Sequence, residues 1–341
     1  MSHALIVRLD SEGDVLLAGP AVRAVAAGSD RVTLLCGPRG SQAAALLPGV
    51  EELVCWRAPW IDPEPDPVDR AGVRALVERI AALDVDRALI LGSFHQSPLP
   101  TALVLRMASV PWIGATCVDY PGALLDLRHA IGDDVHEVER SLDLVRAAGY
   151  ELPAGDDGGL AIRRDGAPSP VDGDYVVVHP GASVPARAWS PGANAALVDA
   201  LVESGRRVVV TGAPGERALT ALVAGPARPE VLDLGGATDL AGLAEVIAGA
   251  DAIVVGNTGP AHLAAAVGTP VVSLFAPTVP PVRWRPWKVP HELLFVAVPC
   301  AGCRARVCPV PGHPCLRGVA PHAAARAVER LTATAPLEAV A

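Results

Sequence analysis

Residues 251–278, DAIVVGNTGPAHLAAAVGTPVVSLFAPT, constrain the fold of this chain more than any other stretch. AIVV and VVSLF are short β-branched runs of the kind that form buried parallel strands. Between them, Pro260 suits the start of a helix because the first helical position needs no N–H. Gly268 and Pro270 are typical of the end of that helix. We therefore expect strand, turn, helix and strand in this order, which is the repeating unit of a parallel sheet.

The turn GNTG within this stretch is a candidate anion site. Gly256 and Gly259 permit tight or positive-φ backbone angles, and the following helix presents free N–H groups beyond the carboxyl edge of the sheet. Thr258 adds a hydroxyl and His262 an imidazole. The alternative is an ordinary turn, in which Thr258 caps the helix and His262 is a surface histidine. The stretch alone leaves both interpretations open.

Strand and helix patterns alternate along the rest of the chain, which is typical of parallel sheets covered on both faces. At 341 residues the chain is long for one core. The polar stretch 153–174, rich in Gly, Asp and Pro, separates two such series. We therefore predict an α/β fold of two Rossmann-like, doubly wound domains, residues 1–160 and 170–341, which face each other across a cleft. The last helix is expected to be able to pack back on the first domain.

The predicted elements are short and closely spaced. Strands are expected at residues 4–9, 31–36, 52–56, 87–91, 112–117, 175–179, 207–211 and 231–233, besides the two in the stretch 251–278. Helices are expected at residues 15–27, 41–47, 68–83, 101–108, 136–148, 194–204, 216–223 and 240–249.

Charge and hydropathy exclude several functional classes. A net charge of −9 and a pI near 5.5 argue against binding to nucleic acid. Apolar runs fall short of the ~20 residues of a membrane span, and the start of the chain lacks the pattern of a signal peptide. We therefore expect a cytoplasmic monomer, for which a peripheral contact with a membrane surface stays open.

The loop after the first strand supplies a candidate catalytic carboxylate. Asp14 follows Gly13 and opens the next helix, where it is either a helix cap or a general base facing the cleft. Asp10 lies in the same loop. No GxGxxG follows this strand, so an oxidoreductase that binds a dinucleotide lacks its fingerprint.

Two loops of the second half carry further polar candidates. Arg187 follows HPGAS, which includes Ser183, and is either a ligand for a phosphate or an ordinary surface arginine. Glu216 ends the motif TGAPGE, which begins with Thr211 and Gly212, and is either a helix cap or an acceptor for ribose hydroxyls.

The order of these motifs resembles the family 9 glycosyltransferases, the heptosyltransferases of lipopolysaccharide cores and their relatives. It consists of GD after the first strand, then HPGA with R-A-W, TGAPGE and GNTGPAH. The resemblance covers nearly the whole chain, from RLDSEGDVLLAGPAVRAV to FAPTVPPVRWRPW. It implies the GT-B fold, catalysis without a metal or cofactor, and a nucleotide-sugar donor, typically ADP-heptose, which is bound mainly by the C-terminal domain.

The resemblance also assigns roles. Asp14 matches the general base, Arg187 a cation near the donor phosphates, and Glu216 an acidic residue near the ribose. Thr258, Gly259 and His262 match the pyrophosphate turn. The remaining candidates lie in the same loops: Ser183, Gly212 and Asn257 on the donor side, Gly13 and Asp10 on the acceptor side.

Two features depart from the family pattern. Asn257 stands where many members carry aspartate, and Asp10 and Glu12 add negative charge beside Asp14, which disfavours its ionised form. They leave the acceptor open between a glycan and a small molecule with a hydroxyl group.

We therefore predict a metal-independent, inverting transfer of a sugar, with heptose from ADP-heptose as the first choice. One alternative is another enzyme of this fold, a nucleotide-sugar epimerase or a phosphorylase; against the phosphorylase, Lys288 is the only lysine, and it lies in a Pro-rich loop. The other alternative is a non-catalytic protein that binds nucleotide sugars.

Four cysteines near the end of the chain, Cys300, Cys303, Cys308 and Cys315, lie close to His313. Such ligands suit zinc, but the spacing CxxC-x4-C-x6-C is not that of a standard zinc knuckle. We therefore favour reduced thiols in a tight loop, with a disulfide on oxidation, over a zinc site.

Overall fold

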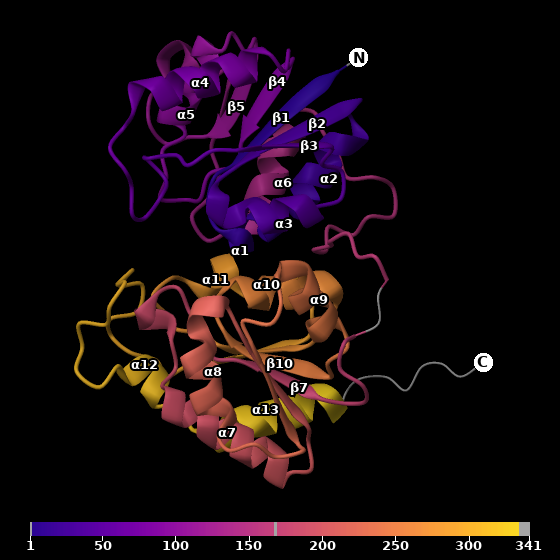
Figure 1. Cartoon of the computed structure of the whole chain (residues 1–341). Helices are drawn as coiled ribbons and strands as arrows, with labels where there is room; N and C mark the ends of the chain where they lie inside the picture. Colours follow the sequence, from indigo (N-terminus) through magenta and orange to yellow (C-terminus); the bar gives the residue numbers. More distant parts are fainter. Residues whose placement is uncertain (1, 167–168, 334–341) are drawn as a thin grey trace. The chain divides into compact units, whose positions relative to one another are not determined.

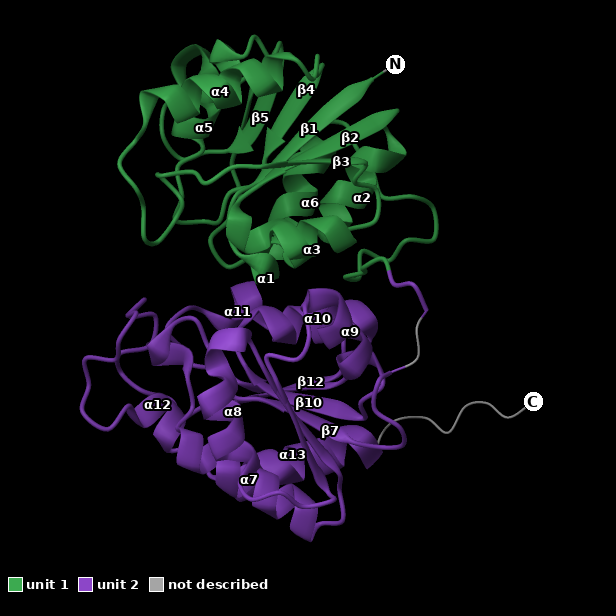
Figure 2. Cartoon of the chain, viewed as in Figure 1, with its two compact units in different colours: residues 1–163 green, residues 164–341 purple. Residues whose placement is uncertain are grey.

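The computed structural model describes residues 2–166 and 169–333 (Figure 1). The chain forms two compact units, Met1–Arg163 (unit 1) and Arg164–Ala341 (unit 2) (Figure 2). The division falls inside the polar stretch 153–174 that the sequence marks as a linker. Within the described part of the chain, no helix is both long and apolar enough to cross a membrane.

Unit 1 is built on a sheet of six parallel strands in the order β3-β2-β1-β4-β5-β6. The central strand β1 is buried along its whole length, and its Ile6 pairs with Leu34 of β2 and Leu89 of β4. The strands are β1 (His3–Arg8), β2 (Arg31–Cys36), β3 (Glu52–Cys55), β4 (Arg87–Ile90), β5 (Trp112–Thr116) and β6 (Leu127–His129).

Helices cover the two faces of this sheet (Figure 1). α2 packs against α6 and α4 against α5, and Leu76 and Ile80 of α4 enter the core formed with β1, β4 and β5. The helices are α1 (Glu12–Leu17), α2 (Gly19–Ala27), α3 (Ser41–Leu46), α4 (Arg70–Ala81), α5 (Leu99–Met107) and α6 (Glu137–Ala147).

The single helix predicted over residues 15–27 is wrong in one respect. The structure forms two helices that meet at Ala18, and the first begins already at Glu12. Pro20 explains the break, because its ring nitrogen cannot donate the hydrogen bond that would continue α1 into α2. Asp14 consequently lies in the first turn of α1 rather than in a turn before the helix.

Unit 2 repeats this plan with the parallel order β12-β11-β10-β7-β8-β9. Its strands are β7 (Val176–His179), β8 (Val208–Gly212), β9 (Val231–Gly235), β10 (Ala252–Gly256), β11 (Val271–Leu274) and β12 (His291–Leu294). Its helices are α7 (Pro191–Glu203), α8 (Arg217–Ala224), α9 (Leu240–Ala248), α10 (Gly259–Val267), α11 (Pro281–Trp284), α12 (Pro314–Arg317) and α13 (Pro321–Ala333). The two sheets confirm the predicted α/β class.

The last helix, α13, is part of the helical layer that covers the sheet of unit 2. α13 packs against α7 and against β10, β11 and β12. The Arg206 guanidinium pairs with both carboxylate oxygens of Glu329, at 3.1 and 3.0 Å, which ties α13 to the chain between α7 and β8. α13 therefore completes the layer on the sheet of its own unit.

The stretch 251–278 folds as the sequence predicts. β10, α10 and β11 follow one another, and Gly268 ends α10 in the left-handed region at φ 85°. Two edge strands, β6 and β12, were not predicted. β6 has only three residues and β12 reads HELL, so neither shows the apolar run of a buried strand.

Candidate functional site

The strand order of unit 2 creates a switch point between β7 and β10. On either side of it the strand order continues in opposite directions, β8 and β9 beyond β7 and β11 and β12 beyond β10. Ligands of doubly wound sheets bind outside the carboxyl ends of the strands at such points. The loop after β7 carries Ser183 and Arg187, and the loop after β10 is GNTG, so both predicted donor loops meet here.

Gly256 allows these two loops to approach closely. A Cβ atom at this position would lie 3.2 Å from the carbonyl oxygen of Arg187. Arg187 ends a short 3-10 turn, Pro185–Arg187, and is half-buried. Neither Gly256 nor Gly259 has a positive φ, so of the tight or positive-φ angles that the sequence permits, the turn does not use the positive-φ ones. Gly256 instead allows the backbone of Arg187 to come close to the end of β10.

Thr258 occupies the N-cap position of α10 but does not cap the helix. Its backbone is extended, at φ −137° and ψ 176°, and its side chain makes no capping hydrogen bond. The hydroxyl is buried and has no hydrogen-bond partner among the described residues. The capping alternative is therefore wrong, and the hydroxyl stands at the N-terminus of α10, the positive end of the helix dipole, where an anion is favoured.

His262 lies in the first turn of α10 and is only 5% exposed. This burial excludes the alternative in which it is an ordinary surface histidine. Gly259 is the first residue of the same helix. Thr258, Gly259 and His262 thus lie at the N-terminus of α10, where the sequence predicts a helix to begin.

Asn257 braces the turn. Its side-chain nitrogen donates to the carbonyl oxygen of Ala276 at 3.3 Å, and its side-chain oxygen accepts from the Ala276 N–H at 3.2 Å. These bonds tie the end of β10 to the chain after β11. Since the Asn257 amide is 6% exposed and engaged in this way, it supports the shape of the turn.

Glu216 lies over the loop that follows β7. Its carboxylate accepts from the Ala213 N–H at 2.8 Å and would collide with any side chain at Gly181. His179 at the end of β7 is buried, and its Nδ1 lies 2.9 Å from the Thr211 hydroxyl. Burial lowers the pKa of His179, although the Glu216 charge opposes this effect. His179 of β7, Thr211 of β8 and Glu216 after β8 therefore form one group of neighbouring polar side chains.

Gly212 ends β8 beneath this group. A Cβ atom there would lie 2.7 Å from a methyl group of Thr220 and 3.3 Å from the Glu216 side chain. Ser183, in contrast, is exposed in the loop after β7. Gly212 thus belongs to the packing that holds Glu216, and Ser183 presents a hydroxyl to solvent.

Unit 1 has its own switch point, between β1 and β4, and Asp14 stands above it. One carboxylate oxygen of Asp14 accepts from Arg8 Nη2 at 3.1 Å, and the other accepts from the Ser11 hydroxyl at 2.8 Å. The N-cap residue of α1 is Ser11, so Asp14 does not serve as the cap. Its side chain is 23% exposed and thus reaches solvent.

Asp10 is engaged more deeply than Asp14, and its side chain is only 9% exposed. It forms an ion pair with Arg8 and accepts hydrogen bonds from the side chains of Ser93 and Gln96. Burial raises the pKa of Asp10, an effect that the Arg8 charge opposes. Gly13 is buried within α1. Of the acceptor-side candidates of unit 1, Asp14 is therefore the open carboxylate.

Sequence reasoning missed four residues around Asp14: Arg8, Ser93, Gln96 and Glu137. One signal was available. Arg8 is a charge at the end of the buried run ALIVRL, and a buried charge needs partners. The identity of those partners was not visible, because the loop after β4 and helix α6 supply them, about 85 to 130 positions further along the chain.

The model of the family described as glycosyltransferase family 9 (heptosyltransferase) matches residues 73–313. The chain belongs to glycosyltransferase family 9. Lipopolysaccharide heptosyltransferase 3 of Escherichia coli is 34% identical over 129 residues, which cover 37% of this chain and 38% of that protein. Lipopolysaccharide heptosyltransferase 1 of Escherichia coli K12 is 29% identical over 235 residues, 66% of this chain and 70% of that protein. The chain thus matches little more than a third of the first relative's length.

Solved structures of the family share the whole fold. The glycosyl transferase family 9 protein of Veillonella parvula superposes with a TM-score of 0.77 at 16% identity and 98% coverage of both chains. Escherichia coli ADP-heptose lps heptosyltransferase II gives a TM-score of 0.72 at 19% identity, with 98% of this chain and 99% of that chain covered. These likenesses confirm the predicted GT-B fold of the family 9 chain.

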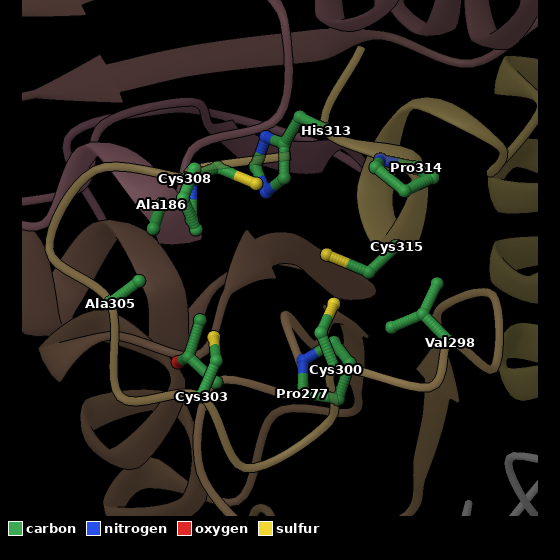
Figure 3. A pocket seen from close by; sticks show the side chains of 12 residues that line it. Ala186, Pro277, Val298, Cys300, Cys303, Ala305, Cys308, His313, Pro314 and Cys315 are labelled. Carbon is green, nitrogen blue, oxygen red and sulfur yellow. The ribbon is translucent and has the colours of Figure 1, made fainter. Parts of the chain in front are cut away.

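Four cysteines of this family 9 chain, Cys300, Cys303, Cys308 and Cys315, line one small pocket together with His313 (Figure 3). Their thiols are unbridged, and burial together with the other three thiols raises the pKa of Cys315. Within residues 2–166 and 169–333, no three Cys, His, Asp or Glu side chains are arranged to hold a metal ion.

The loop of residues 300–315, which carries these four cysteines, is hydrogen-bonded to the backbone near the donor-side loops. The Ala186 N–H donates to the Arg306 carbonyl at 2.9 Å, which anchors the turn that carries Arg187. The N–H groups of Gly302 and Arg304 donate to the carbonyls of Pro277 and Thr278, at 2.7 and 2.9 Å. The loop thus fixes the backbone on both sides of the β7–β10 switch point.

Proposed function

We propose that this family 9 protein transfers a sugar from a nucleoside diphosphate donor to an acceptor hydroxyl, with heptose as the sugar and ADP-heptose as the donor. The observation that carries the proposal is the N-terminus of α10, where the unpartnered Thr258 hydroxyl and the buried His262 lie beside the turn of Arg187. Hydroxyl, imidazole, guanidinium and helix N–H groups are all suited to a diphosphate. The names of the relatives support heptose as the sugar.

The leaving diphosphate gains negative charge in the transition state. The helix end, Thr258, His262 and Arg187 would stabilise that charge by donors and cations fixed in advance. Because these groups can stabilise the charge of the departing diphosphate by themselves, we propose that the reaction needs no metal ion. Inversion at the anomeric carbon follows if the acceptor displaces the diphosphate directly.

The acceptor hydroxyl must lose its proton as it attacks, and Asp14 is the base that we propose. It is the open carboxylate of its group, and both of its oxygens are held by hydrogen bonds. A general base of this kind contributes about 10²–10⁴-fold to the rate. The acceptor is proposed as a glycan or a small molecule with a hydroxyl, in a reaction that a monomer carries out in the cytoplasm.

Calorimetric titration with ADP in the presence of EDTA, followed by a transfer assay, tests the proposal. ADP should bind without a divalent cation, and ADP-heptose should release ADP only when a glycan or small hydroxylated acceptor is added. Absence of ADP binding would remove the donor site from unit 2. Binding without ADP release across an acceptor panel that includes lipopolysaccharide-core glycans would favour a non-catalytic binding protein, and epimerised sugar nucleotide would favour an epimerase.

A further inference from the structure

Arg8 is enclosed at the switch point of unit 1. It is the last residue of β1 and its side chain is 1% exposed. Nη1 donates to the Leu91 carbonyl at 2.9 Å, and Nη2 donates to the Ser93 hydroxyl at 2.8 Å. These contacts come from the chain just after β4, so the guanidinium is locked between the two central strands.

Three carboxylates surround this one guanidinium. Asp10 lies 2.9 Å from Nε, Asp14 lies 3.1 Å from Nη2, and Glu137 lies 3.6 Å from Nη2. Glu137 is the first residue of α6, is 1% exposed, and has no hydrogen bond to either carboxylate oxygen among the described residues. Of the three carboxylates, only Asp14 reaches solvent to a sizeable degree.

A buried cluster of charges such as this one contributes little to the stability of the fold. A buried ion pair gains little or nothing over apolar residues of the same size, because both charges lose their hydration. Here one buried guanidinium faces all three carboxylates, and the charge of Arg140 also acts on Glu137. A cluster of this kind, with its one open member at a ligand-binding edge, is better explained by what it does to that member.

We infer that Arg8 is a positioning residue for Asp14, an inference that rests on the proposed function. The planar guanidinium fixes one oxygen of Asp14 in place, and the Ser11 hydroxyl fixes the other. The positive charge of Arg8 favours the ionised carboxylate, which is the form that accepts a proton. Asp10 pairs with Nε, and Glu137 lies 3.6 Å from Nη2, so both carboxylates stabilise the buried charge of the guanidinium.

Two substitutions separate geometry from charge. Arg8→Lys keeps the charge but loses the fork that reaches Leu91, Ser93 and Asp14 at once, so kcat should fall about tenfold or more while the acidic limb of the pH–rate profile stays in place. Arg8→Met also loses the charge, and its acidic limb should move to higher pH by about one unit or more. In both variants the Kd for ADP should remain that of the wild type. Arg74→Lys and Arg74→Met, at an exposed ion pair with Glu78, are the matched controls.

Arg8→Met leaves buried carboxylates without their cation and could therefore unfold the protein. The same substitution is therefore also made in a variant that lacks two of these carboxylates. Asp10→Asn combined with Glu137→Gln removes the two inner charges and retains Arg8 and Asp14. Adding Arg8→Met to this pair then isolates the effect of Arg8 on Asp14. The carboxyl signal of Asp14, observed by carbon NMR in aspartate-labelled protein, should titrate at a pH about one unit or more higher in the triple variant.

The two readouts distinguish the possible failures. If the wild type transfers no sugar, the proposed function fails, and the NMR titration still tests the influence of Arg8 on Asp14. If Arg8→Lys retains wild-type kcat, or if the Asp14 signal titrates at the same pH with and without Arg8, the positioning role is overturned. A purely structural Arg8 would lower the melting temperature and leave both the acidic limb and kcat per folded enzyme unchanged.

Discussion

The backbone of Arg187 rests against Gly256: a Cβ atom on the glycine would lie 3.2 Å from the Arg187 carbonyl oxygen. This approach joins the loops after β7 and β10, which carry the donor-side residues of the proposed site. It exists because position 256 has no side chain. The contact therefore requires a residue without a side chain at position 256.

Gly256→Ala should displace the Arg187 turn by a few tenths of an ångström and weaken ADP binding by about tenfold. Overpacking of this kind typically costs about 1–3 kcal/mol of stability. Calorimetry with ADP and a thermal melt measure the two effects. Gly192→Ala is the control, because a Cβ there meets nothing within 4 Å in the exposed first turn of α7. Unchanged ADP affinity in Gly256→Ala would show that Arg187 is not held for the donor.

Thr258→Val should weaken ADP binding about tenfold with little loss of stability. Valine has the same shape, and the hydroxyl that it removes makes no capping bond and has no partner within the described residues. A hydrogen bond to a charged group contributes about 1.5–3 kcal/mol. Thr258→Ser retains the hydroxyl and should bind ADP nearly as the wild type does. Equal weakening in both variants would point to lost packing of the methyl group.

Asp14→Asn should retain ADP affinity and lose transfer activity by about 10²–10⁴-fold in kcat. The asparagine oxygen can still accept from Arg8 and its NH2 group can donate to the Ser11 hydroxyl oxygen, whereas the side chain cannot take up a proton. Steady-state kinetics with the acceptor measure the loss, and Glu12→Gln in the same turn is the control. If Asp14→Asn turns over at close to the wild-type rate, the base is another residue.

The parts of this molecule that follow from the sequence are those encoded locally. The β10–α10–β11 unit is written in consecutive residues, as apolar runs, Pro260 and Gly268, and it folds as predicted. The engagement of Asp10 and the position of Glu137 depend on contacts among β1, the loop after β4 and α6. Periodicity carries no information about which distant side chains will meet. The break at Ala18 was visible in principle, since Pro20 interrupts the helix pattern.

The cysteines should react with iodoacetamide in an order set by their exposure. Cys55, Cys300 and Cys303 are exposed and should be labelled within minutes at pH 7.5, whereas Cys36, Cys117 and Cys315 are buried and should react far more slowly. Burial raises the pKa of Cys36 to about 12, which keeps it in the unreactive thiol form. Peptide mass spectrometry over a time course measures each site. Protection of Cys300 and Cys303 that disappears with a chelator would restore the zinc alternative, and protection that disappears with a reductant would indicate a disulfide.

Glu137→Gln should stabilise the folded protein at pH 8 and change it little at pH 4. Burial raises the pKa of Glu137, the Arg8 charge opposes this effect, and the Asp14 charge adds to it. In the unfolded chain the carboxyl loses its proton near its ordinary pKa, whereas in the folded chain it retains the proton to higher pH. The stability associated with this group is therefore present below the unfolded value and is lost as the pH rises through the folded value.

Glutamine removes that loss because it is neutral at every pH and has nearly the same shape. We expect the free energy of unfolding at pH 8 to be higher for the variant than for the wild type, because the raised pKa of Glu137 destabilises the folded wild type at this pH. Urea denaturation at pH 4, 6 and 8 measures the difference, and Glu139→Gln, at an exposed position of the same helix turn, should show no such trend. A Glu137→Gln variant less stable than the wild type at pH 8 would mean that the ion pair with Arg8 outweighs the burial of the charge.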